Sequence, residues 1–83
     1  MAGYHLKEIE RGVYGELSKI REEVEEMQDA AEQGNKVMVL IELSDLIGAV
    51  EGYLEKEYGD KITLNDLLVM ARTTRRAFES GAR

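Results

Sequence analysis

Residues 37–50 read Val-Met-Val-Leu-Ile-Glu-Leu-Ser-Asp-Leu-Ile-Gly-Ala-Val, and this stretch decides the fold. It is almost wholly apolar, so we expect it to be buried, yet it carries two acids, Glu42 and Asp45. A buried carboxylate is costly unless a charged partner, a shared proton or a bound cation neutralises it. The three-residue gap places both acids on one side of a helix, so a neighbouring element must supply the compensating groups.

The segments on either side of this stretch also show helical spacing and indicate an all-α fold. Three helices are predicted, at about residues 14–33, 35–58 and 64–80. Gly34-Asn35 and Gly59-Asp60 end the first two helices, and Thr63 with Asp66 resembles the capping box that starts a helix. Because the second helix is apolar around most of its girth, we expect it to be the central, most buried element.

The N-terminal residues 1–12 lack clear periodicity, and Gly12 and Gly15 interrupt any helix that starts early. We therefore expect an irregular arm attached to one helical domain that spans residues 1–83. The lone His5 lies in this arm. It is either a solvated or hydrogen-bonded side chain, the commoner case, or a ligand or general base.

The composition limits partners and compartment. A chain of 83 residues buries a limited core, so oligomerisation is expected. The absence of cysteine removes disulfides and thiolate metal sites. A net charge of −6 argues against broad nucleic-acid binding, and the sequence shows neither a membrane span nor a signal region. We expect a cytoplasmic protein without nucleic-acid or membrane partners.

The acids of the first helix, in Arg-Glu-Glu-Val-Glu-Glu at residues 21–26, are sorted by helical geometry. Relative to the apolar stripe of this helix, Glu22 and Glu25 point to the far side, toward water. Glu23 and Glu26 lie on a flank of the stripe and can face a neighbouring helix. This second pair is therefore the candidate partner of the acids in the apolar stretch.

Antiparallel packing across the Gly34 turn brings Glu23 and Glu26 opposite Glu42 and Asp45. Carboxylates converging in a partly dry groove repel one another, and divalent cations remove the conflict. Oxygen ligands without Cys or His favour Mg²⁺ or Mn²⁺ over zinc. Magnesium is commonly shared with substrate phosphates, so a nucleotide or another phosphorylated substrate is expected.

At these residues the chain resembles the MazG-like all-α nucleoside triphosphate pyrophosphohydrolases. The family signature is Glu-x-x-Glu, a spacer, and Glu-x-x-Asp. Here it reads Glu23-Val-Glu-Glu26, fifteen intervening residues and Glu42-Leu-Ser-Asp45. The resemblance covers about residues 16–54, and the short length with the ending Arg-Arg-Ala-Phe-Glu-Ser-Gly-Ala-Arg is similar to the small members often seen in phages.

The resemblance implies Mg²⁺-dependent cleavage between the α and β phosphates of a nucleoside triphosphate, giving monophosphate and pyrophosphate, in the host cytoplasm if a phage encodes the chain. The implied catalytic and metal-binding residues are Glu23, Glu26, Glu42 and Asp45, with Mn²⁺ as the alternative ion. Either Glu23 or Glu26 is the candidate general base.

Family members often contact nucleotide through an Asn and a Lys in the last helix, and no such pair aligns here. Arg75 shares a stripe with Leu68 and Phe78, so we expect it to face inward and contact phosphate. The candidate substrate-binding residues are Lys19, Arg72, Arg75 and Arg76. Ion pairing of each arginine with surface acids is the competing interpretation.

Two alternatives stay open. One is a non-catalytic dimeric interaction module whose acids pair with the three arginines. The other is a hydrolase of the same superfamily acting on phosphoribosyl-ATP or dUTP. Because three helices enclose a nucleotide poorly, we expect a homodimer or homotetramer built as a helical bundle. Tyr4, Tyr14 and Tyr53 are candidates for gripping the base, or pack in the core or rim.

Overall fold

The computed structural model describes residues 5–81, which form helices and, over this range, no strand. The helices are α1 (Leu17–Glu32), α2 (Lys36–Tyr58) and α3 (Leu64–Glu79). The predicted all-α fold and its three helices are confirmed. α1 begins later than predicted, because residues 14–16 form a turn in which Gly15 has a φ of 94°. None of the helices within residues 5–81 combines the length and apolarity that crossing a membrane requires.

Side-chain caps fix where α2 and α3 begin. The Asn35 side chain accepts a hydrogen bond of 3.0 Å from the Met38 N–H at the start of α2. At the start of α3 the Thr63 N–H donates to Asp66 Oδ2 at 2.8 Å, and the Asp66 N–H donates back to Thr63 Oγ1. Both halves of the predicted capping box are therefore present, with Asp in place of the usual Glu.

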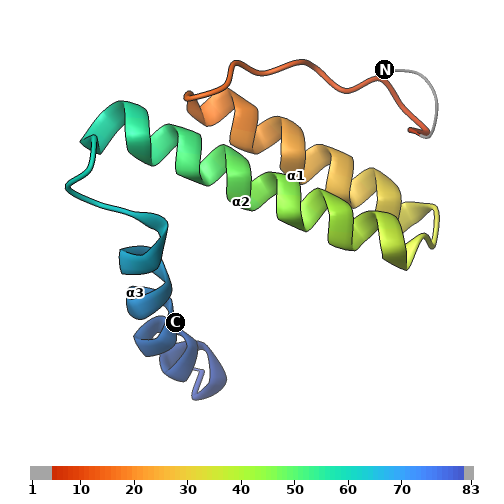
Figure 1. Cartoon of the computed structure of the whole chain (residues 1–83). Helices are drawn as coiled ribbons and strands as arrows, with labels where there is room; N and C mark the ends of the chain where they lie inside the picture. Colours follow the sequence, from red (N-terminus) through yellow and green to blue (C-terminus); the bar gives the residue numbers. More distant parts are fainter. Residues whose placement is uncertain (1–4, 82–83) are drawn as a thin grey trace.

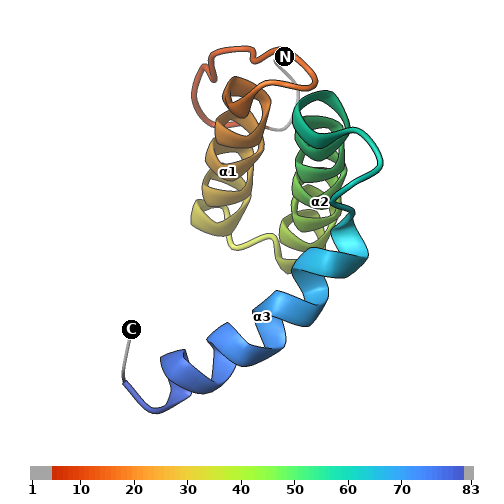
Figure 2. The same cartoon turned by 90° about the vertical axis from the view of Figure 1, so that its left-hand side faces the viewer.

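α1 and α2 lie side by side and antiparallel, joined by the short turn at Gly34, where φ is 73° (Figure 1). The described part of the arm, from residue 5 onward, has no regular structure and runs back along α1. α3 does not continue the bundle. It leaves the end of α2 and projects away from the pair (Figure 2). In the single chain, therefore, α1 and α2 form a helical hairpin, and α3 extends away from this hairpin.

Among residues 5–81 the interior contains more acids than apolar side chains. Its buried charged residues are Glu22, Glu23, Asp29 and Glu42. Its buried apolar residues are Ala30, Ala49 and Leu54. The expectation that α2 is the most buried element holds only on the face toward α1, because α3 turns away. The large apolar side chains that α2 leaves exposed include Val37, Leu40, Ile41, Leu43 and Ile47.

Candidate metal centre

The α1–α2 hairpin brings carboxylates from both helices together. Glu23 from α1 and Glu42 and Asp45 from α2 each offer one oxygen, and these atoms lie within 4.8 Å of one another. Glu26, one helical turn after Glu23, approaches Glu42 from the other side. The predicted convergence agrees with this antiparallel packing. The expected burial of Asp45 is wrong, since Asp45 is exposed while Glu42 is only 1 % exposed.

Two oxygens of this cluster have no hydrogen-bond partner among the described residues. These two atoms are Glu23 Oε1 and Glu42 Oε1, and both are buried. A buried polar atom that loses water without gaining a partner costs about 1–3 kcal/mol, and more if it is charged. Such atoms in a natural chain call for an explanation, and a ligand that binds to carboxylate oxygens supplies one.

The pKa values of these acids show that burial and mutual repulsion disfavour their charged forms. Burial, followed by the charge of Glu26, raises the pKa of Glu23 above its ordinary value. Burial and the charge of Glu42 likewise raise the pKa of Glu26. Burial is also the largest cause of the raised pKa of Glu42. A hydrogen bond with Glu26 opposes this rise but does not cancel it. Each acid therefore binds a proton more readily than an isolated glutamate does.

Lys19 is the lysine nearest to the cluster. Its Nζ lies 3.0 Å from Glu22 Oε1 and 3.4 Å from Glu23 Oε2. The hydrogen bond to Glu22 is the main reason that the pKa of Lys19 is raised. A single lysine shared between two acids leaves negative charge in excess around Glu23 and Glu42.

The prediction that Glu22 faces water is wrong, because the arm covers it. Glu22 is buried and accepts a hydrogen bond of 2.8 Å from the Gly12 N–H. Burial alone would raise the pKa of Glu22, but the bonds from Gly12 and Lys19 outweigh it and lower that pKa. Glu22 is therefore satisfied within the chain and anchors the arm. Glu25, also predicted to face water, is partly buried.

A groove of about 440 Å³ opens beside the acids. It is lined by Tyr14, Lys19, Glu23, Ser44, Asp45, Gly48, Ala49 and Glu51. Tyr14 forms one wall, where its ring lies against the bare backbone of Gly52. Tyr53 instead packs edge-on against Tyr58 at a centroid distance of 6.4 Å, and Tyr4 lies outside the described residues. The groove gives a ligand access to Asp45 and Lys19.

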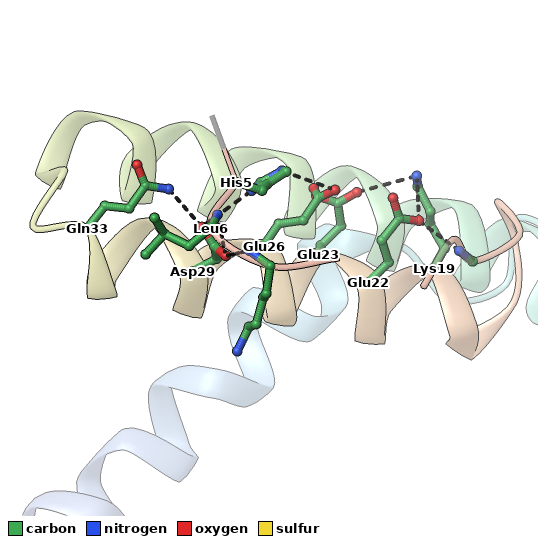
Figure 3. A network of polar contacts seen from close by, with 10 residues as sticks. His5, Leu6, Lys19, Glu22, Glu23, Glu26, Asp29 and Gln33 are labelled. Atoms are coloured by element: carbon green, nitrogen blue, oxygen red, sulfur yellow. Dashed lines mark hydrogen bonds and ion pairs between the residues drawn. The ribbon is translucent and has the colours of Figure 1, made fainter. Parts of the chain in front are cut away.

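His5 from the arm and Asp29 from α1 also lie in this region, and sequence reasoning did not single out Asp29 (Figure 3). The His5 side chain is 3 % exposed and lies beside two acids, which excludes the solvated side chain but not the hydrogen-bonded one. Asp29 is fully buried and accepts hydrogen bonds from the N–H groups of Leu6 and Lys7 and from the Gln33 amide. Burial would raise its pKa, but these bonds prevail and lower it.

The candidate arginines lie elsewhere. Arg72, Arg75 and Arg76 belong to α3, which projects away from the acids (Figure 2). Arg75 is exposed and bonds to Glu79 at 2.9 Å, so the expectation that it faces inward is wrong for the single chain. Within residues 5–81 none of these arginines forms an ion pair with the acids of α1 or α2.

The donor set suits a hard divalent cation. Carboxylate oxygens are the ligands that Mg²⁺ and Mn²⁺ prefer, and the unpartnered oxygens of Glu23 and Glu42 are free to serve. Asp45 adds an oxygen from the groove side. Comparison with family models, with curated proteins and with solved structures gave no match.

Proposed function

We propose that the chain is a Mg²⁺-dependent nucleotide pyrophosphohydrolase of the MazG-like type. The observation that carries the proposal is the buried oxygen without a hydrogen-bond partner on both Glu23 and Glu42, within reach of Asp45 at an open groove. These residues and Glu26 are the proposed metal ligands. Mn²⁺ is the alternative ion, because it accepts the same oxygen ligands.

The reaction is the attack of water on a nucleoside triphosphate, which breaks the bond between the α and β phosphates and releases monophosphate and pyrophosphate. When bound, Mg²⁺ polarises phosphoryl oxygens and offsets the negative charge of the transition state. Glu23 or Glu26 accepts the proton of the attacking water, and the raised pKa of each makes it a better base than an ordinary glutamate.

Lys19 and Tyr14 flank the groove on the side where a substrate enters. Lys19 holds a phosphate oxygen, for which it exchanges part of its pairing with Glu22 and Glu23. Tyr14 supplies an aromatic wall for the base. Asp45 is exposed at the same groove and lies between the buried acids and the phosphates.

A second copy of the chain completes this arrangement. The exposed apolar side chains of α2 and α3, among them Leu40 and Phe78, need a partner surface, and oligomers commonly supply one. α3 projects away from the acids of its own chain, so its candidate arginines Arg72, Arg75 and Arg76 are not committed to that chain's groove. We therefore propose a homodimer or homotetramer in which arginines of one protomer bind the phosphates held by another.

Pyrophosphate release from a panel of nucleoside and deoxynucleoside triphosphates, with and without Mg²⁺, tests the proposal. Phosphoribosyl-ATP and dUTP belong in the panel, because the acid cluster does not distinguish among these substrates. Glu42→Gln should lower turnover by about a hundredfold or more, as expected when a metal ligand is lost. The exposed Glu57 of α2 gives the matched control, and Glu57→Gln should retain full turnover. If none of these substrates is turned over in a Mg²⁺-dependent manner, the proposal is refuted.

The alternative of a non-catalytic interaction module predicts a different result. In that hypothesis the acids are paired with arginines, so Glu42→Gln leaves a cation without its partner and lowers stability whether or not Mg²⁺ is present. In the described chain the arginines of α3 do not pair with these acids, so the module requires such pairing between protomers. A Mg²⁺-independent loss of stability in Glu42→Gln supports the module instead.

A further inference from the structure

The arm places the only histidine of the chain against the acid cluster. His5 Nε2 lies 3.6 Å from Glu26 Oε2, and His5 Nδ1 lies 3.7 Å from Asp29 Oδ1 (Figure 3). One nitrogen of His5 and one oxygen each of Glu26 and Glu42 lie within 4.8 Å of one another. This group shares Glu42 with the cluster of Glu23 and Asp45, and its Glu26 is also among the ligands proposed for Mg²⁺.

We propose that His5, Glu26 and Glu42 form a second cation site, selective for a first-row transition-metal ion such as Co²⁺, Mn²⁺ or Zn²⁺ over Mg²⁺. The site lies on the arm side of Glu42, whereas the site for Mg²⁺ lies on the groove side. The proposal deepens the proposed function by naming a second ion at the same centre, but the binding it describes does not require catalysis.

The chemistry of the ligands gives the selectivity. An imidazole nitrogen binds first-row transition ions well, while Mg²⁺ prefers oxygen and retains its waters. Ligand atoms about 2.0–2.2 Å from one ion are separated by about 3.0–4.2 Å, depending on the angle between the bonds. The 3.6 Å between His5 Nε2 and Glu26 Oε2 falls within that interval.

Two further observations point to a ligand here. Glu42 is 1 % exposed and has a buried oxygen without a hydrogen-bond partner, so the centre of the group contains an acceptor that nothing in the described chain satisfies. Asp29 lies beside the other ring nitrogen of His5. Histidines that bind metals commonly donate that second N–H to a carboxylate, which fixes the tautomer and the orientation of the ring.

The arm is held in a way that suits this role. Asp29 bonds to the N–H groups of Leu6 and Lys7, the residues that directly follow His5. The backbone at His5 is thereby fixed against α1 before any ion binds. A ligand on a preorganised segment loses less conformational freedom on binding than one on a free chain end.

Proton NMR of the 83-residue chain with Co²⁺ tests the proposal on the wild type. Binding of the imidazole to paramagnetic Co²⁺ shifts the exchangeable ring N–H far outside the ordinary spectrum, and the lone histidine makes the assignment unambiguous. We expect this signal to appear with Co²⁺ and to persist in Asp45→Asn, which changes the groove side only. A Co²⁺-loaded wild type without the shifted signal overturns the proposal, as does a failure to bind Co²⁺.

Titration calorimetry supplies an independent readout. His5→Ala should weaken Co²⁺ binding by about tenfold or more, while Mg²⁺ affinity should change by less than about twofold. Glu57→Gln should alter neither affinity. Co²⁺ binding by His5→Ala that equals the wild type overturns the proposal. Mg²⁺-dependent hydrolysis without the shifted signal refutes this site alone, and the shifted signal without hydrolysis refutes the proposed function alone.

Discussion

The N–H of Gly12 donates a hydrogen bond of 2.8 Å to Glu22 Oε1, so a buried acid of α1 holds the end of the arm that runs along it. Position 12 also has no room for a side chain, because a Cβ there would collide with the backbone carbonyl of Ser18. Together with Asp29, which binds Leu6 and Lys7, this contact attaches both ends of the described arm to α1.

Replacing Glu22 by Ala should release the arm. The variant loses the bond to Gly12 and the pairing with Lys19, and hydrogen bonds to charged groups contribute about 1.5–3 kcal/mol. The Gly12 amide should therefore exchange its hydrogen about tenfold faster or more, and trypsin should cleave after Arg11 more readily. Glu25→Ala on the same helix is the control. Equal exchange rates in the two variants would contradict the anchoring role.

The contact of Tyr14 with Gly52 predicts opposite effects at two glycines of α2. A Cβ at position 52 would lie 2.5 Å from the Tyr14 ring, so Gly52→Ala should cost about 1–3 kcal/mol and displace Tyr14 from the groove. Nothing lies within 4 Å of a Cβ at position 48. Gly48→Ala should therefore stabilise the helix, by about 0.5–1 kcal/mol. Urea denaturation measures both, and equal stability of the two variants would refute the close contact.

Replacing Glu42 by Gln should stabilise the metal-free protein at high pH. The pKa of Glu42 is raised above 4.5 by burial and by the charges of Asp45 and Glu23, so the folded wild type loses stability as the pH rises from 4.5 through the raised pKa. Glutamine does not ionise. Its advantage in unfolding free energy should reach about 1–3 kcal/mol near pH 8 and disappear below about pH 4.

Urea denaturation in chelator at several pH values measures this advantage, with Glu57→Gln as the control. Saturating Mg²⁺ should reverse the order at about pH 8, because an ion that binds only the folded wild type adds to its stability. A variant that is less stable than the wild type at every pH would show that Glu42 is held by a partner in the chain rather than by a cation.

The exposed apolar face of α2 should mediate association. Leu40 and Val37 are 67 % and 68 % exposed in the single chain, which is unfavourable for side chains of this size. Leu40→Lys should convert the proposed homo-oligomer into monomers and lower its thermal midpoint. Light scattering during gel filtration measures the mass. A wild type that elutes as a monomer at micromolar concentration would reject the proposed assembly.

The sequence predicts the helices and the meeting of acids because both follow from periodicity. Carboxylate oxygens of Glu23 and Glu42 come within 4.8 Å of one another once the two helices pack antiparallel across Gly34. The position of the arm does not follow from periodicity, since residues 5–12 have none. The burial of Glu22 and His5 therefore could not be derived. The one available signal was a glycine, Gly12, close in sequence to the Glu-rich helix, whose backbone N–H could bond to one of the acids.

The course of α3 was missed for a different reason. Its stripe of Leu68 and Phe78 predicts a packed face, but periodicity does not say whether the same chain or another covers it. The short loop before Thr63 directs α3 away from α1, so Arg75 is exposed. Sequence reasoning identifies the face, and the three-dimensional arrangement shows that α1 of the same chain does not cover it.

Within residues 5–81 the interior holds four acids and three apolar residues, and this has a consequence for the life of the protein in a cell. Proteases degrade a protein through its open forms, and a hydrocarbon interior suppresses opening under any ionic condition. Under the proposed function, that protection depends on a cation bound by Glu23 and Glu42. The half-life of the protein should therefore follow the supply of free divalent ions, and a chain made during metal starvation should be degraded quickly.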